Sequence, residues 1–512
     1  MLWLCENFAP LAVALAASAV AWMYGGARGD LLPPVVPWIF ALLLEVFLCF
    51  PQRHHYETSF KARERVWREL RRSPVFWTAL GLLLLLLIPF VNNGLCPGCD
   101  AALIAQGVNP SPKVPFLPFC VDRIDHLSVV LGMAMAFLLS VVVFFGLTRD
   151  GKRLALELIV WNGVAMAAFG FLQVAMDASG PFWDAPPSGM DGFVHGSYFS
   201  VFGYPNMAGD YFTLLFGISI ALWRHHSEEY EQAAKTNGTL ERAKTTRRSE
   251  QFLRRHYLLI PAVIFYFSAL YTLSRAAIIL ATSTAFVYFV HTLWNSLSHM
   301  KKSRRVIVGV WSLLAFSLVV FFATIFMPKD IRREVNTLDS VGMLDRVTGR
   351  GQYHTAVATA IWKDHLLFGC GGWGYKHLCV PKMTEMKMDV KRSLQTIGGA
   401  NVHNDYLQFL AEHGLVGFGA MVLLALLMFF PVARQWARLV KDLRFSKEAA
   451  KITKPKEIFV LPAPAFIVMV AILASLIHAF GDCPLRSSAV LSLVYISIAA
   501  LGGFMPQYSK AK

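Results

Sequence analysis

Residues 77–91 read WTALGLLLLLLIPFV, a stretch that contains no Asp, Glu, Lys or Arg. A second uncharged stretch of this kind covers Leu127–Leu147. An apolar run of about 20 residues can cross the roughly 30 Å hydrocarbon core of a bilayer as a helix. In the whole chain of 512 residues, 55% are hydrophobic and 16% are charged, whereas soluble domains have about 25% charged residues. This composition excludes a soluble multidomain enzyme, a disordered chain and a fibrous repeat, and it predicts a polytopic membrane protein.

The apolar runs predict an all-α fold with about twelve transmembrane helices. They are expected at residues 8–25, 34–50, 74–92, 126–147, 154–175, 207–223, 257–273, 276–297, 306–327, 414–431, 457–479 and 488–504. Of the 48 Lys and Arg residues, 32 lie in alternate connections and in the C-terminal tail. Lys and Arg are concentrated on the cytoplasmic side of membrane proteins, so both termini are expected there. The net charge of +15 is therefore attributed to topology, and no nucleic-acid partner is expected.

The cysteines follow the same map, because six of the eight fall on the outer side. They are Cys96, Cys99, Cys120, Cys370, Cys379 and Cys483. Cysteines in an oxidising compartment suggest disulfides, and six of them allow 15 pairings. The Cys-x-x-Cys pair at 96–99 lies in a Pro-rich loop, where a structural disulfide is favoured over a redox pair or a zinc site.

A charged residue marks the middle of the longest apolar segment. Residues 257–297 are apolar for about twice the length of one span and have basic flanks on both sides. We therefore expect a hairpin whose turn, with Arg275, reaches the outer face. A basic side chain near hydrocarbon is often only an anchor that extends to the polar surface. Arg275 is the only charged residue of the hairpin, however, and such a charge is a functional lead, so we expect it to bind an anion.

The outer loop Pro328–His413 is too long for a simple connection. Its helical stretch Gly351–Phe368 follows Arg350, and Arg346 lies four residues earlier. The next residues, 369–374, match G-x-G-x-x-G, but they follow a helix and open no βαβ unit, so the context excludes a dinucleotide site. Their successive N–H groups are able to cradle an anion. Trp373 and Lys376 belong to this region, and a surface ion pair is the alternative role for each cation.

A polar cluster precedes the span at 414–431. It contains His403, Asn404 and Asp405 in the segment 401–407, on the side that holds Arg275 and Arg350. A single His near the end of a span is often structural, which is the alternative to a catalytic role. Further upstream, Asn206 opens the span at 207–223 and is expected either to cap that helix or to bind a sugar.

These segments, in this order, resemble the O-antigen ligase and polymerase superfamily of bacterial inner-membrane glycosyltransferases. The residues that carry the resemblance are Ser274-Arg275-Ala-Ala, then Arg350, Trp362, Gly369 and Gly371, then His403-Asn-Asp-Tyr-Leu with Glu412-His-Gly414-Leu-Val-Gly417. An upstream Gly-x-x-Pro-Asn-x-x-Ala motif is similar at Tyr204–Ala208, although Tyr204 replaces its first Asn. The match covers residues 203–430, and the flanks agree only in topology.

The resemblance implies a fold like that of the GT-C glycosyltransferases, with an active site that faces the periplasm. It also implies transfer of a glycan from a polyprenyl-pyrophosphate carrier, such as undecaprenyl pyrophosphate, to an acceptor hydroxyl. Inversion at the anomeric carbon without a metal or another cofactor is expected, in the assembly of lipopolysaccharide or another surface polysaccharide. The acceptor is a glycan, lipid A core or another hydroxyl compound, and membrane lipids surround the protein.

The residue types fit this chemistry. Arg binds phosphate oxygens bidentately and stays ionised, so Arg275 and Arg350 are predicted to bind the pyrophosphate, with Arg346 beside them. His403 is predicted to be the general base, and Asn404 or Asp405 is expected to orient its ring. The predicted substrate-binding residues are Arg346, Asn404, Asp405, Asn206, Trp373 and Lys376, and no residue is assigned to a metal.

Three regions follow from these assignments: N-terminal transmembrane helices at 1–202, a catalytic region with the loop 328–413 at 203–430, and a C-terminal region at 431–512 with a cytoplasmic loop and the last two spans. A twelve-span transporter or a flippase for lipid-linked glycans is the alternative function. An inactive relative that only binds polyprenyl carriers is a third. The enzyme hypothesis requires that Arg275, Arg350 and His403 meet in one outward-facing pocket.

Overall fold

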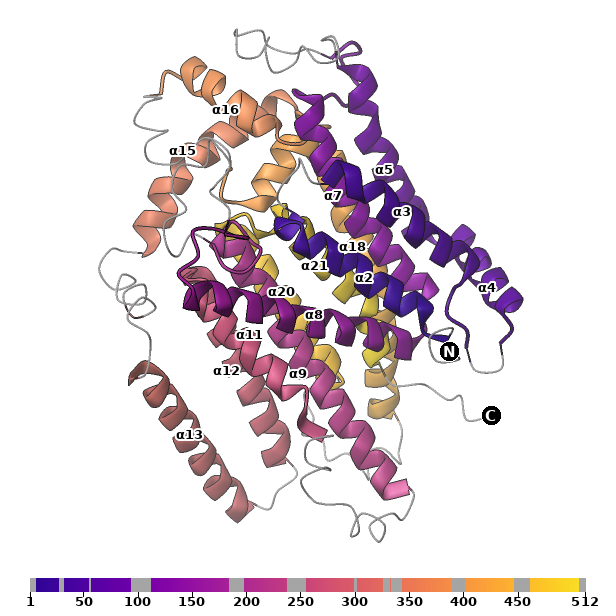
Figure 1. The fold of residues 1–512 in the computed structure, drawn as a ribbon, viewed down its shortest axis with the longest axis vertical. Helices are drawn as coiled ribbons and strands as arrows, with labels where there is room; N and C mark the ends of the chain where they lie inside the picture. The colour runs from indigo at the N-terminus through magenta and orange to yellow at the C-terminus, as the bar shows by residue number, and fades with distance from the viewer. Residues whose placement is uncertain are drawn as a thin grey trace.

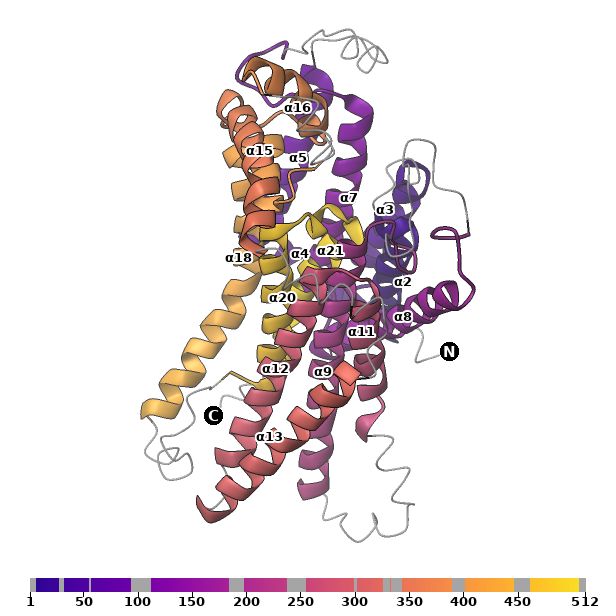
Figure 2. The same cartoon turned by 90° about the vertical axis from the view of Figure 1, so that its left-hand side faces the viewer.

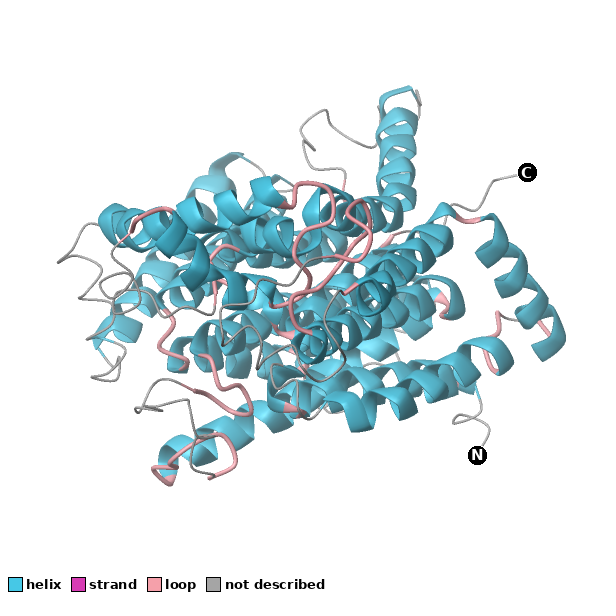
Figure 3. Cartoon of the chain, turned by 90° about the horizontal axis from the view of Figure 1, so that it is seen from above, coloured by secondary structure: helices cyan, strands magenta, loops and turns pink. Residues whose placement is uncertain are grey.

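The structure, a computed structural model, is described here for residues 6–26, 32–54, 57–93, 112–183, 198–236, 255–298, 302–325, 332, 343–388, 401–445 and 461–505. Within these ranges the regular structure is helical and no strand occurs. Figure 3 shows this part of the chain as helices joined by loops. The predicted all-α fold is confirmed.

Six helices in the described ranges are long and apolar enough to cross a membrane. They are α5 (Pro74–Asn92), α7 (Arg123–Val141, extended by the π-turn Val142–Gly146), α8 (Arg149–Ala175), α12 (Arg275–Ser298), α18 (Asp405–Phe445) and α20 (Ala463–Gly481). Four shorter apolar helices are α2 (Phe8–Trp22), α3 (Leu32–Cys49), α11 (Leu259–Tyr271) and α21 (Ser488–Ala500). The two remaining predicted spans coincide with α9 (Pro205–Thr236) and α13 (Lys302–Ile325). Each predicted span therefore overlaps a helix, whereas twelve crossings remain a prediction.

Helices α9, α20 and α21 lie near the middle of the bundle, and α15 (Met343–Asp364) and α16 (Gly374–Glu385) lie at one end of it (Figures 1 and 2). Helix α9 packs against α11 and α20, and α21 packs against α7. A Cβ on Gly209 would lie 2.3 Å from Cβ of Ala277 in α12, and one on Gly217 would lie 2.4 Å from Cβ of Ala471 in α20. Small residues at these contacts let the helix backbones approach closely. The start of α9 is thereby held beside the start of α12 and the last turns of α20.

The predicted hairpin at 257–297 is confirmed. Helix α11 ends at Tyr271 and α12 begins at Arg275, with Thr272–Ser274 as the turn. Leu273 has a φ of 56°, which L-residues rarely adopt, and Oγ of Ser274 accepts a hydrogen bond from N of Ala277 at 3.2 Å. The polar residues in the middle of the apolar segment therefore form the turn, as their sequence position indicated.

The Gly-rich turn is not an anion cradle, and that prediction is wrong. Gly414 has φ 64° and ψ −173° and interrupts α18, so carbonyls in the preceding turn lack their usual helical partners. N of Cys370 donates to the Ala411 carbonyl at 3.0 Å, and N of Gly371 donates to the Glu412 carbonyl at 2.8 Å. N of Gly372 donates to Nδ1 of His126. The amides of Cys370 and Gly371 thus attach the outer segment, residues 369–372, to the break in α18 at Gly414.

The disulfides predicted for the outer cysteines are also corrected. Cys370, Cys379 and Cys483 are free thiols, and Sγ of Cys120 donates to the Pro89 carbonyl at 3.6 Å. Cys96 and Cys99 lie outside the described residues. The free thiols are buried as small apolar groups in the packed outer segment. Among the described residues, no disulfide joins Cys370, Cys379 or Cys483, and packing holds this segment.

Candidate functional site

His403 lies two residues before α18 and has a φ of 55°. A non-Gly residue in the left-handed region costs about 1–3 kcal/mol, and such strain is concentrated at functional sites. Its side chain is 31% exposed, so the ring is accessible, and its Nδ1 lies 3.3 Å from Oδ1 of Asp482. The neighbouring backbone reinforces this contact, since N of Asp405 donates to the Asp482 carbonyl at 3.2 Å.

Asp482 follows the last residue of α20 and is not among the residues predicted from the sequence. Its carboxylate accepts hydrogen bonds from OH of Tyr204 at 3.0 Å, from Nδ2 of Asn206 and from N of Cys483 at 2.7 Å. Burial alone would raise the pKa of this carboxyl group. The hydrogen bond to His403 and the charges of His403 and His478 hold the Asp482 pKa below its ordinary value. Asp482 is therefore ionised near neutral pH.

An ionised carboxylate accepts hydrogen bonds but cannot donate them. Nδ1 of His403 must then carry the proton in the contact with Asp482, which leaves Nε2 as the basic nitrogen of the neutral ring. We call the side chains of Tyr204, Asn206, His403 and Asp482 the His403 cluster. It joins the start of α9, the turn before α18 and the end of α20.

Asn206 lies in this cluster, as the sequence suggested, but its contact is with Asp482. Nδ2 of Asn206 donates to that carboxylate and to OH of Tyr204, the latter at 3.1 Å. Burial, followed by the nearby Asp482 charge, raises the pKa of Tyr204 well above its ordinary value. The Tyr204 hydroxyl thus remains a proton donor to Asp482. The Tyr that departs from the family motif supplies a contact of its own.

The wall behind His403 comes from α15 and α16. The ring of His354 lies 5.7 Å from the His403 ring, and its Nδ1 lies 2.6 Å from OH of Tyr375. Burial raises the pKa of Tyr375, and the thiol of Cys379, 3.7 Å away, adds to the shift. Tyr375 therefore stays protonated, and its hydroxyl shares a hydrogen bond with Nδ1 of His354. The predicted long loop is in this way packed directly onto the candidate base.

Arg275 is the first residue of α12 and is half-buried. The start of α12 contacts α9 at Gly209, which lies three residues after Asn206. The turn with Arg275 and the His403 cluster are thus at the same end of α9. Arg346 and Arg350 lie in α15 by their backbone, and their side chains are outside the described part of the structure.

The carboxylate that contacts Nδ1 of His403 is that of Asp482, whereas Asn404 or Asp405 was predicted to orient this ring. Oδ1 of Asn404 accepts from N of Leu407 at 3.1 Å, which caps the start of α18. Oδ2 of Asp405 accepts from N of Leu485 at 2.7 Å. Both side chains satisfy backbone amides at helix and turn ends, so they position the segment around His403.

Trp373 contacts the short turn η4 (Pro484–Arg486), and Lys376 contacts α7. The guanidinium of Arg486 lies 4.2 Å from the centre of the Trp373 ring. Nζ of Lys376 lies 3.1 Å from Oδ2 of Asp125 in α7. Trp373 therefore lines a neighbouring pocket, whose contacts are described below, whereas Lys376 pairs with Asp125.

A second polar layer lies one turn deeper between α9 and α20. Nδ1 of His478 lies 2.9 Å from Oδ1 of Asp210, both side chains being 1% exposed. Oγ of Ser475 donates to the other oxygen of Asp210. Ionisable residues at this depth are expensive unless paired, and here they pair with one another.

In the part of the chain that the structure describes, two groups of side chains have the spacing of metal ligands. His403, Asp482 and Cys483 offer atoms within 4.8 Å of one another, but burial and the Asp482 charge raise the Cys483 pKa, which disfavours the thiolate that metals bind. The second group is Asp122, Asp125 and His377. Its Asp125 oxygen is already shared by the Lys376 amino group, so a cation is present there.

The fold and the site define an all-helical membrane protein with a His–carboxylate cluster at the ends of three packed helices. Comparison with known families then identifies part of the chain: the family described as O-Antigen ligase matches residues 260–422. The resemblance of this part of the chain to the O-antigen ligase and polymerase superfamily is thereby confirmed. No curated protein matches the chain.

The matched range includes Arg275, Arg350 and His403 but ends before Asp482. It supports glycan transfer as the general activity, with a lipid-linked glycan and a glycan acceptor as partners. Because Asn206 and Asp482 come from outside this range, helices that flank it complete the His403 cluster.

Proposed function

We propose that this protein moves a glycan from a polyprenyl-pyrophosphate carrier to an acceptor hydroxyl on the periplasmic side of the inner membrane. The reaction is an inverting transfer that needs no metal and serves the assembly of a surface polysaccharide. The observation that carries the proposal is the His403–Asp482 pair, whose partly exposed His403 ring belongs to the matched O-antigen ligase range.

The acceptor hydroxyl attacks the anomeric carbon of the donor sugar while its proton moves to Nε2 of His403. Asp482 holds Nδ1 and stabilises the imidazolium that forms, as an orienting carboxylate does in other His-based sites. The bond from the anomeric carbon to the pyrophosphate oxygen breaks, and its electron pair leaves with the pyrophosphate. A single displacement of this kind inverts the anomeric carbon.

Charge on the departing pyrophosphate requires cationic groups. Arg275 opens α12, where the guanidinium and the positive end of the helix dipole favour an anion together. In α15, position 350 lies one turn before His354, whose ring is next to that of His403. Helix positions four residues apart share a face, so we expect Arg350 on the face of α15 that is turned to the His403 cluster.

The test uses the purified chain in lipid nanodiscs with a radiolabelled polyprenyl-pyrophosphate glycan and a hydroxyl acceptor. His403→Ala should lower the transfer rate about 10²–10⁴-fold, the usual contribution of a general base. Arg275→Ala should lower it about 10²–10³-fold, as the loss of a preorganised donor does. His225→Ala is the matched control, because His225 also pairs with a carboxylate, Glu229 at 2.9 Å, but near the opposite end of α9.

Unchanged transfer by well-folded His403→Ala protein would remove the general-base role. Donor that crosses the membrane of proteoliposomes chemically intact, without transfer in any condition, would instead favour the flippase or transporter alternative. Transfer that depends on His403 and Arg275 but not on His225 supports the enzyme.

A further inference from the structure

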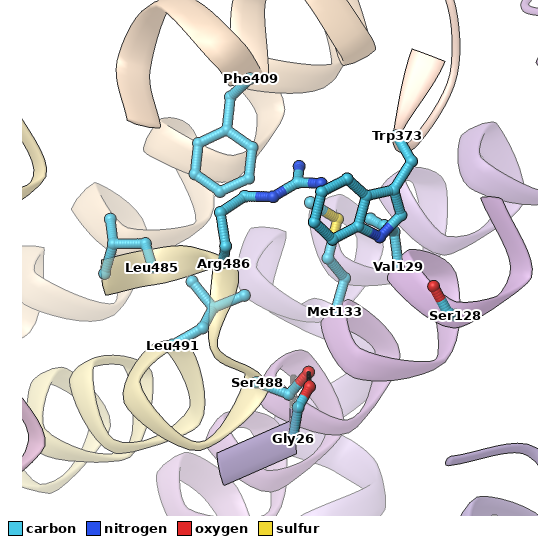
Figure 4. A pocket seen from close by; sticks show the side chains of 10 residues that line it. All are labelled: Gly26, Ser128, Val129, Met133, Trp373, Phe409, Leu485, Arg486, Ser488 and Leu491. Carbon is cyan, nitrogen blue, oxygen red and sulfur yellow. Dashed lines mark hydrogen bonds between the residues drawn. The ribbon is translucent and has the colours of Figure 1, made fainter. Parts of the chain in front are cut away.

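A pocket separate from the His403 cluster lies behind the turn η4. Its volume is about 410 Å³ with the solvent space at its mouth included. The residues that line it are Gly26, Ser128, Val129, Met133, Trp373, Phe409, Leu485, Arg486, Ser488 and Leu491 (Figure 4). The chemistry of these lining side chains therefore decides which ligand the pocket accepts.

Arg486 supplies an unused donor to this pocket. Its side chain is only 3% exposed, and its Nη1 donates to Oε2 of the fully buried Glu412. Its Nη2 is buried without a hydrogen-bond partner among the described residues. An unsatisfied buried polar group carries a free-energy penalty, and an acceptor oxygen bound in the pocket would remove that penalty.

Trp373 forms the wall beside this donor. Its φ of 57° is in the left-handed region, which is unusual for a bulky residue. The strain is sustained by packing, because a Cβ on the preceding Gly372 would lie only 2.8 Å from Cβ of Val129. Figure 4 shows the indole ring beside the guanidinium of Arg486 in the wall of the pocket. The strained backbone at Trp373 thus places its indole ring beside the Arg486 guanidinium.

The charge in the pocket is already balanced. Glu412 pairs with the Arg486 guanidinium, and the buried carboxyl group of Asp405 binds the amide of Leu485 immediately before it. A further anion would therefore meet one compensated cation and a neighbouring acidic group. The remaining N–H donor favours a neutral oxygen such as a hydroxyl or an amide carbonyl.

The pocket also offers acceptors. Oγ of Ser128 donates to the Asp125 carbonyl at 2.7 Å, and Oγ of Ser488 donates to the Gly26 carbonyl at 3.2 Å. Each hydroxyl oxygen keeps lone pairs for a ligand. A donor, two acceptors, an aromatic ring and apolar walls together match a hydroxylated ring with an apolar face.

We propose that this pocket binds one uncharged sugar residue of the glycan, as a subsite that the Trp373 and Arg486 side chains form. The proposal rests on the proposed function. Arg486 is four residues from Asp482 in the chain, so their Cα atoms are at most about 14 Å apart. The subsite therefore lies within a few sugar residues of the reacting bond and holds the glycan during transfer.

The test measures binding without turnover, so that it does not depend on transfer. The probes are the methyl glycosides of glucose, galactose, mannose, rhamnose, N-acetylglucosamine and N-acetylgalactosamine, with glucose 6-phosphate and inorganic phosphate as charged comparisons. Saturation-transfer NMR on the full chain in nanodiscs reports each contact. Ser128→Phe fills the pocket and loses only a hydrogen bond within its own helix, while Ser283→Phe adds the same group to an exposed position of α12.

At least one neutral glycoside should bind the wild type and the Ser283→Phe protein with equal affinity, and phosphate should not compete with it. Ser128→Phe should abolish this binding, and Trp373→Ala should weaken it about tenfold or more. Absence of binding by every neutral glycoside, binding unaffected by Ser128→Phe, or displacement by phosphate would each overturn the subsite. Glycoside binding by a protein without transfer activity would refute the proposed function but not the subsite. Transfer activity without glycoside binding would refute the subsite but not the proposed function.

Discussion

The sharpest perturbation of the proposed mechanism is Asp482→Asn. The substitution keeps the size of the side chain and removes the charge that faces Nδ1 of His403. The amide also presents an N–H₂ group to Nδ2 of Asn206 or to the Tyr204 hydroxyl, which both donate to Asp482 in the wild type. The variant thus tests the charge and the direction of the hydrogen bonds, not the packing.

The size of the effect follows from the contact. A general base contributes about 10²–10⁴-fold, and the distance of 3.3 Å between Nδ1 and Oδ1 is longer than the 2.7–3.2 Å of a typical N–H···O bond. Asp482 should therefore account for the lower part of that range. We expect a rate loss of about 10²–10³-fold, which corresponds to about 3–4 kcal/mol in the activation free energy.

The assay is the initial rate of glycan transfer by the purified protein at neutral pH. Asp364→Asn is the control, since Asp364 is an exposed partner of Lys382 and surface pairs are worth about 0–1 kcal/mol. A wild-type rate in folded Asp482→Asn protein would refute the reasoning.

Four further outcomes are expected. Tyr204→Phe removes a donor to Asp482 and should lower the transfer rate about tenfold with normal expression; an unchanged rate would separate Tyr204 from the site. Chelation with EDTA should leave the transfer rate unchanged, and a loss that zinc restores would assign a metal to the group with Cys483. Gly414→Ala should destabilise the protein by more than about 2 kcal/mol, because the added Cβ would lie 2.3 Å from the Leu367 backbone. Gly419→Ala on the same helix is the control, since its Cβ would meet nothing within 4 Å. Thermal unfolding in detergent compares the two variants. The pKa of Asp482 is lower in the folded state than in the unfolded state. Its contribution to stability is therefore present above its unfolded pKa of about 3.9 and is lost as pH falls through the folded value. The unfolding free energies of the wild type and Asp482→Asn should converge in acid and differ near neutral pH.

The sequence was informative where one local feature decides the structure. A segment of twice the span length with a single charge at its middle can only turn back there, and α11 and α12 do so at Arg275. His403 could be found for a similar reason, because a polar cluster at the edge of an apolar run is costly unless it is used. Both inferences need only the properties of a bilayer and a short stretch of chain.

The partners of these residues could not be found in the same way. Asp482 is 79 residues from His403 in the chain, and only the packing of α20 against α9 and the turn before α18 brings them together. A signal was nevertheless present: a single acidic residue in the short connection between two apolar spans. Asn404 and Asp405 were favoured because they are adjacent to His403 in sequence, but the start of α18 and the amide of Leu485 engage their side chains.

The G-x-G pattern shows why a motif needs its partner. Taken alone, its amides suggest an anion site, yet they bind carbonyls that the break at Gly414 exposes. Gly369 and Gly414 lack side chains, and this lets the two backbone segments approach closely. A Cβ on Gly369 would lie 2.3 Å from the Glu412 backbone, and one on Gly414 would lie 2.3 Å from the Leu367 backbone. The two glycine-containing motifs are thus halves of one contact, which fixes the outer segment to α18 next to His403.

The polar residues of α9 and α20 are spaced so that one packing satisfies both layers. Asn206 and Asp210 are four residues apart in α9, and His478 and Asp482 are four residues apart along the end of α20. Asn206 bonds to Asp482, and Asp210 bonds to His478 one turn deeper. A slide of one helix along the other would break both contacts together and leave buried charges unpaired, which costs more than the loss of either bond in water. The deeper pair therefore fixes the register of the two helices, and through that register it holds Asp482 at the ring of His403.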